Sequence, residues 1–170
     1  MPAIDSTTNV PDFMKVRRRV REFRRNPLDV KDLRTWAANT CDELDLWGYS
    51  EDVRLITSEL VGNAVKYAQH LSAIRNGEDP FIKDPLGHVV IIYDTVKKLL
   101  RHEVWDVGNY VPYYRTHETT VNEQGERVLV TSEVAESGRG IALCGLLADR
   151  QGAYVRFDSK CFWHEWDVKE

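Results

Sequence analysis

Apolar residues recur at three- and four-residue spacing in three segments of this sequence, which predicts three helices. The first predicted helix follows the chain break at Asn26-Pro27 and runs to about Leu46. Its N-cap is expected to be Asp29 or Asp32, since a carboxylate accepts hydrogen bonds from the free N–H groups of a first turn. Its long apolar stripe indicates a structural role.

The second predicted helix is the most informative part of the chain. It begins at a capping Ser50, continues through apolar positions at helical spacing and ends near His70. Glu59 and Asn63 lie four residues apart, so they share one face of this helix. A carboxylate and an amide in that arrangement can bind one ligand together.

The third predicted helix covers residues 141–148 and is preceded by Gly138-Arg139-Gly140. Glycines directly before a helix allow the backbone to approach a phosphate group, whose charge the helix N-terminus stabilises. Taken alone, this motif is more often a tight turn. It supports phosphate binding only in combination with other motifs.

Runs rich in β-branched and aromatic residues predict four strands, at residues 88–94, 99–107, 153–157 and 161–168. A short turn at 95–98 makes the first two strands an antiparallel hairpin and puts Asp106 near a strand end. The order of all elements predicts an α+β fold, a two-layer α/β sandwich with helices on one face of a mixed or antiparallel sheet.

Three polar stretches separate or precede these elements. Residues 1–11 form an N-terminus that is expected to be loose, and residues 70–87 read as a loop. Residues 109–137 form a second long connection. A connection of that length in a compact domain is usually functional or disordered.

Composition places the chain among single-domain proteins. Its 170 residues, of which 42% are hydrophobic, suit one domain over 1–170 with a sizeable core. The net charge of −4 argues against general nucleic-acid binding, and no apolar run reaches the ~18 residues that span a bilayer. Cys41, Cys144 and Cys161 form neither a paired framework nor a metal motif, so buried thiols and a reducing cytoplasm are expected.

Residues 15–25 are strongly basic, with seven Lys or Arg residues and one acid, Glu22. This segment is either a docking surface for an acidic partner or nucleic acid, or an edge strand or short helix with a solvated basic face. The second interpretation is favoured, because no aromatic residue lies among the basic residues of 15–21 for base stacking and the rest of the chain is acidic.

Three stretches together resemble one family. Residues 58–68 resemble the N box of the histidine-kinase-like ATPases, the Bergerat-fold or GHKL ATP-binding domains. Residues 105–108, followed by Pro112, resemble the first glycine box, and residues 136–152 resemble the second. The boxes occur in the family's order. Within this family the chain is most similar to the anti-sigma factor serine/threonine kinases and related small ATP-binding regulatory proteins of actinobacteria.

The resemblance implies a site for ATP and Mg²⁺. It makes Asn63 the Mg²⁺ ligand through its amide oxygen, and Glu59 the general base that takes a proton from a serine or threonine hydroxyl or from water. Asp106 would accept a hydrogen bond from the adenine amino group, and Gly108 would leave room for the ring. Considered alone, Asp106 is equally well explained as a turn residue at a strand end.

The phosphates would be bound by the second glycine box. Gly138 and Gly140 would offer backbone N–H groups, and Arg139 would act as a charge clamp on the γ-phosphate. Residues 109–137 would form a lid that closes over the nucleotide.

Two functions follow from the resemblance. One is a cytoplasmic protein serine/threonine kinase that binds a sigma factor and phosphorylates an STAS-type antagonist, with homodimer formation possible in this family. The other is a non-catalytic switch in which ATP controls a protein-binding surface. Glu59 favours the kinase, whereas Asn109 and Glu136, at places where relatives carry a glycine and a basic residue, leave room for the switch. An α+β domain without nucleotide is the third interpretation.

Overall fold

The computed structural model describes residues 15–74, 85–107, 119–121, 127–129, 136–155 and 159–169. Five strands form one sheet in the order β1-β2-β3-β7-β6, and every neighbouring pair is antiparallel. Their bounds are β1 Val16–Phe23, β2 Gly87–Asp94, β3 Leu99–Val107, β6 Arg150–Val155 and β7 Ser159–Asp167. A separate antiparallel pair joins β4 (Thr119–Val121) to β5 (Arg127–Leu129).

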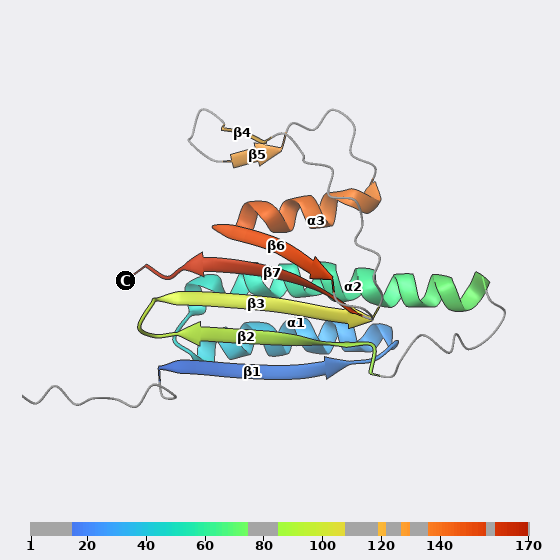
Figure 1. The fold of residues 1–170 in the computed structure, drawn as a ribbon, viewed down its shortest axis with the longest axis horizontal. Helices are drawn as coiled ribbons and strands as arrows, with labels where there is room; N and C mark the ends of the chain where they lie inside the picture. Colours follow the sequence, from blue (N-terminus) through green and yellow to red (C-terminus); the bar gives the residue numbers. More distant parts are fainter. Residues whose placement is uncertain are drawn as a thin grey trace, which may run out of the picture.

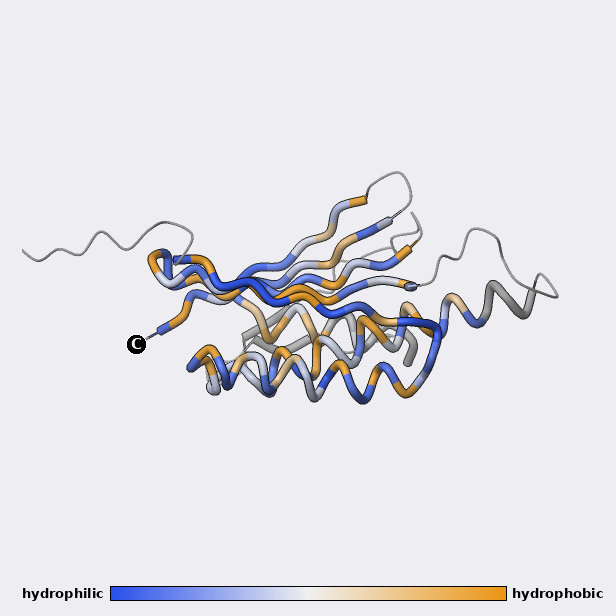
Figure 2. The backbone as a smooth tube through the Cα atoms, turned by 90° about the horizontal axis from the view of Figure 1, so that it is seen from below, coloured by the Kyte–Doolittle hydropathy of each residue, from blue (hydrophilic) through white to orange (hydrophobic). Residues whose placement is uncertain are grey.

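Helices α1 (Pro27–Glu43), α2 (Ser50–Ile74) and α3 (Glu136–Leu147) lie on one side of the sheet, and a 3₁₀ turn (Trp47–Tyr49) joins the first two. Figure 2 shows the two layers edge-on. Alternate strand residues such as Val89, Ile91 and Val104 face the helices and are fully buried against Leu33 and Ile56. The predicted α+β fold with an antiparallel sheet is therefore confirmed, and so is the β2–β3 hairpin.

The opposite face of the sheet is covered by no described helix (Figure 1). Its side chains pair with one another: Arg101 contacts Glu103 at 2.7 Å and Glu165 at 2.6 Å, and its guanidinium lies 4.8 Å from the centre of the Trp163 ring. Arg150 extends this network to Glu165 at 3.1 Å. Charged and aromatic groups thus stabilise a sheet face that lacks a helix layer.

Helix α1 differs from the prediction at both ends. Its N-cap is Asn26, whose side chain accepts a hydrogen bond from Leu28 N at 3.0 Å, so Asp29 and Asp32 are not the cap. The helix ends at Glu43, because Asp45 adopts a left-handed conformation (φ 61°) and Leu46 N bonds back to Cys41 O at 2.8 Å. Such an end usually contains glycine, and its absence made the predicted end at Leu46 three residues too long.

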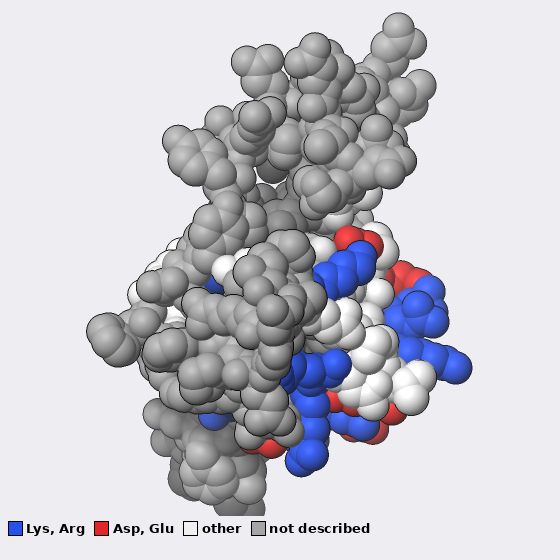
Figure 3. All heavy atoms as spheres, turned by 90° about the vertical axis from the view of Figure 1, so that its right-hand side faces the viewer, with Lys and Arg blue, Asp and Glu red and all other residues white. Residues whose placement is uncertain are grey.

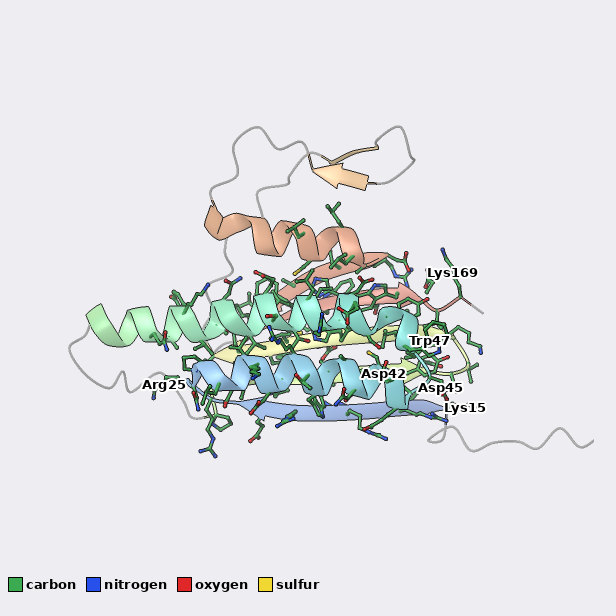
Figure 4. All side chains as sticks on the ribbon, turned by 180° about the vertical axis from the view of Figure 1, so that it is seen from behind. Lys15, Arg25, Asp42, Asp45, Trp47 and Lys169 are labelled. Carbon is green, nitrogen blue, oxygen red and sulfur yellow. The ribbon has the colours of Figure 1, made fainter. Side chains whose placement is uncertain are left out.

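Figure 4 shows Asp42, Asp45 and Trp47 together at the turn that follows α1. Helix α2 begins at Ser50 as predicted, but the Ser50 hydroxyl donates to the Asp42 carboxylate instead of capping the first turn. The helix continues to Ile74, past the predicted end at His70. The bond between Ser50 and Asp42 ties the start of α2 to the end of α1.

The glycine motif does not precede α3 as predicted. The helix starts at Glu136, so Gly138-Arg139-Gly140 lies within its first turn and a half. Strand β6 starts at Arg150, three residues before its predicted start. Strand β7 starts at Ser159, two residues before its predicted start, so it includes Lys160.

The loose N-terminus predicted at 1–11 falls outside the described residues. Most of the loop at 70–87 and most of the lid at 109–137 also fall outside them. All three cysteines, Cys41, Cys144 and Cys161, are buried free thiols, as expected. Seven of the eight residues of β1 are exposed, so the basic segment is an edge strand with a solvated basic face.

Candidate functional site

One face of α2 carries Glu59, Asn63 and Tyr67 at four-residue spacing, so their side chains form a row along the helix. Glu59 and Asn63 are half-buried, and Tyr67 is 37% exposed. One end of the row contacts α3, and the other end contacts the sheet. The helix therefore links the two parts of the predicted site.

The α3 end of the row is a close contact between Glu59 and Gly140. A Cβ atom on Gly140 would overlap the Glu59 carboxylate and would lie 2.8 Å from its Cδ. Cys144, one turn further along α3, is 1% exposed, and burial, together with the charge of Glu59, raises the pKa of its thiol to about 12. The structure thus brings the predicted acid of the N box against the predicted phosphate-binding helix.

This contact is testable by a double-mutant cycle. Alanine is favoured over glycine inside a helix by about 1 kcal/mol, but at Gly140 its methyl group must push Glu59 aside. We expect Gly140→Ala to stabilise the Glu59→Ala variant by about 1 kcal/mol more than it stabilises the unmodified protein. Urea unfolding of the four proteins measures this difference, and equal effects in both backgrounds would refute the contact.

The sheet end of the row is a buried ion pair. Lys160 on β7 lies 2.8 Å from Asp106 Oδ1 on β3, with the side chains only 8% and 5% exposed. The ammonium group also lies 5.6 Å from the centre of the Tyr67 ring. Burial raises the pKa of Asp106 to about 6, although Lys160 acts in the opposite direction.

Sequence reasoning missed Lys160. Asp106 and Lys160 are cross-strand partners in the β3–β7 register, yet they lie far apart in the chain and no motif connects them. The carboxylate that the resemblance assigns to the adenine amino group therefore already faces a cation. A carboxylate has about four lone-pair positions, so Asp106 keeps acceptor capacity beside its contact with Lys160.

Asn63 lies between the two ends of the row. No described residue makes a hydrogen bond to its half-buried amide. An amide oxygen is a hard donor of the kind that Mg²⁺ prefers, and Mg²⁺ bound mainly by phosphates and water needs few protein ligands. The described residues contain no cluster of three or more His, Cys, Asp or Glu that could hold a metal ion.

The structure describes the remaining predicted site residues only in part. Gly108 is outside the described residues. Gly138 and Arg139 lie in the first turn of α3, where backbone N–H groups have no partner within the helix. Gly140 is the fifth helical residue, so its N–H belongs to the helix ladder, and the prediction that it offers this group to a phosphate is wrong. The Arg139 side chain is also outside what the structure describes, so its role as a clamp stays a prediction.

A second polar feature beneath α2 was not predicted. His102 and His164 are cross-strand partners, 0% and 1% exposed, and Thr57 Oγ1 lies 2.9 Å from His102 Nε2. The Thr57 hydroxyl donates its hydrogen to Val53 O, so it accepts a hydrogen bond from His102 Nε2–H. The pKa of His102 keeps the ring neutral near pH 7. Burial, together with the nearby His164, lowers the pKa of His102 to about 3. Burial lowers the pKa of His164 to about 4.

Comparison with known proteins adds no identification. A scan of protein-family models finds none that matches this sequence, and no curated protein matches it significantly. The described helices include none that combines the length and the apolar character needed to cross a membrane.

Proposed function

We propose that this protein binds Mg²⁺-ATP and acts as a serine/threonine kinase of the anti-sigma factor type. The observation that carries the proposal is the contact between Glu59 and Gly140. It joins the two sequence motifs that resemble the N box and the second glycine box, which lie 81 residues apart. The contact sets the acid of one motif against a glycine of the other, at a position where a Cβ atom would overlap the carboxylate.

The proposed chemistry uses three groups. Asn63 holds Mg²⁺, which neutralises charge on the phosphates. The N–H groups of the first turn of α3 bind phosphate oxygens. Glu59 is half-buried and receives no hydrogen bond from the described residues, so its carboxylate is available to take the proton of an attacking hydroxyl.

The proposed partners follow from the family resemblance. They are a sigma factor, which the protein would bind, and an STAS-type antagonist, which would supply the serine or threonine. The proposed location is the cytoplasm, and a homodimer fits the same picture. Neither nucleic acid nor membrane is required.

The second candidate is a nucleotide-controlled binding module without transfer. Glu136 and Asn109 favour it, because they stand where relatives carry a basic residue and a glycine. In this case nucleotide would change a protein-binding surface without phosphate transfer.

Two substitutions separate binding from catalysis. Asn63→Ala is expected to abolish Mg²⁺-dependent ATP binding, because it removes the metal ligand. Glu59→Gln keeps the size of the side chain beside Gly140 and is expected to preserve binding while slowing transfer about 100- to 10,000-fold. Calorimetry measures binding, and transfer of radiolabelled phosphate to a co-purified protein measures catalysis.

Gln69→Ala is the matched control, since it removes an exposed amide from the same helix. It should change neither quantity. Unchanged ATP affinity in Asn63→Ala would overturn the metal site. ATP binding without transfer in the unmodified protein, in the presence of its partner, would favour the second candidate.

A further inference from the structure

Strand β1 forms one edge of the sheet, and its outer side pairs with no described strand. Figure 4 shows that it runs along the length of the molecule, between Lys15 at one end and Arg25 at the other. Alternate residues of an edge strand direct their N–H and C=O groups outward, where another extended chain can pair with them.

The side chains of β1 are unusually basic. Four arginines lie in the strand: Arg17, Arg18, Arg19 and Arg21. All four are exposed, and none forms an ion pair with a described residue. Seen from the end of the molecule where β1 finishes, Lys and Arg side chains gather on the described surface, with some Asp and Glu among them (Figure 3).

The two faces of the strand differ in chemistry. Arg17, Arg19 and Arg21 are opposite Tyr93, Ile91 and Val89 in the register with β2, so they lie on the helix side of the sheet. Val16 and Val20 lie on the other side and are 45% and 48% exposed. Arg18 and Glu22 lie on that side as well, so a neighbouring strand would meet a row of three arginines on one face and a mixed row of apolar and charged groups on the other.

We propose that β1 is a docking strand for an extended acidic peptide of a protein partner, which adds a sixth strand to the sheet. Main-chain hydrogen bonds along β1 would provide affinity, and side chains would provide specificity. The peptide would carry Asp or Glu at every second position, opposite Arg17, Arg19 and Arg21, and apolar residues between them. This inference does not depend on the proposed nucleotide site.

Two other roles of β1 compete with docking. One is protection against aggregation, and the other is binding of a nucleic acid. Charged side chains on edge strands prevent aggregation, but protection alone would not leave Val16 and Val20 exposed on the other face. A nucleic acid would also bind exposed arginines through its phosphate groups. It is disfavoured because the chain as a whole is acidic and no aromatic side chain lies in the exposed part of β1.

The test is fluorescence anisotropy with a labelled peptide of four Glu-Val repeats. Saturable binding is expected at low salt, and Arg19→Glu/Arg21→Glu should weaken it about tenfold or more, because attraction at two cross-strand positions becomes repulsion. The matched control is Lys66→Glu/Lys169→Glu, which changes net charge equally at exposed positions away from β1. It should change the affinity less than about twofold.

Two further probes identify the mode of binding. A peptide with N-methyl groups on alternate residues keeps its charge but cannot pair as a strand, so its binding should be lost. A peptide with its glutamates in one block should bind at least about tenfold more weakly. Equal binding of either probe, tighter binding of single-stranded oligothymidine, or equal effects of the two double variants would overturn the proposal.

Discussion

Replacing Lys160 by methionine is expected to destabilise the protein by about 3–5 kcal/mol at pH 8, because it leaves a buried carboxylate without its cation. The cost is limited by protonation. Asp106 already has its pKa raised to about 6, and without Lys160 it would become neutral at a still higher pH. The destabilisation should therefore shrink at pH 5. Urea unfolding followed by tryptophan fluorescence at both pH values measures it.

Two companion variants make the result specific. Asp106→Asn/Lys160→Met removes both charges and should recover most of the lost stability. Lys97→Met breaks an exposed ion pair with Asp94, in which Lys97 is 74% exposed, and should leave stability unchanged. If Lys160→Met cost no more than Lys97→Met, the buried ion pair would not exist in solution.

Acid is expected to destabilise the fold well above the range in which most carboxylates titrate. His102 and His164 bind protons in the unfolded chain near pH 6.5, but in the folded chain only near pH 3 and pH 4. Stability is therefore lost as the pH falls below about 6.5, by about 2 kcal/mol per histidine between pH 7 and pH 5. A protonated ring would carry an N–H with no partner, since neither Nδ1 atom has one among the described residues.

Asp106 acts in the opposite direction. Its folded pKa of about 6 lies above its unfolded value of 3.8, so it stabilises the fold by about 1 kcal/mol over the same interval. A net loss of about 3 kcal/mol from pH 7 to pH 5 is expected.

His102→Gln isolates the histidine contribution to this loss. The glutamine amide can still donate to Thr57, and the variant should lose about 2 kcal/mol less than the unmodified protein. His88→Gln is the comparison: burial also lowers the pKa of His88, but this side chain is only half-buried on the other face of the sheet, so its variant should recover less of the loss than His102→Gln. Equal pH dependence in the unmodified protein and in His102→Gln would contradict the buried neutral state.

The elements of the fold were predictable because each is encoded locally. The apolar spacing of α2 and the alternation in β2 and β3 identify these elements without knowledge of their neighbours. The ends of α1 were not predictable in the same way. At its start, Asn26 and two nearby aspartates are all suitable cap residues, and the sequence pattern does not distinguish them. At its end, Asp45 adopts the left-handed conformation that glycine usually provides.

The candidate site was predictable only where it depends on motifs. Glu59 and Asn63 were identified from their spacing, and the structure adds the contact between Glu59 and Gly140. Lys160 was missed because its position is determined by the register of β3 and β7, which a single sequence does not encode in any short pattern. The buried pair of His102 and His164 was missed for the same reason.

The order β1-β2-β3-β7-β6 keeps the docking edge apart from α3. Four strand spacings separate β1 from β6, a distance of about 19 Å. The Trp166 indole N–H donates to Leu147 O at 2.6 Å, which fixes the end of α3 near the opposite edge of the sheet. Substitutions at the two sites should therefore have additive effects. Because the two sites are separate, single arginine substitutions in β1 could change which peptide is bound without affecting the row of Glu59, Asn63 and Tyr67 on α2.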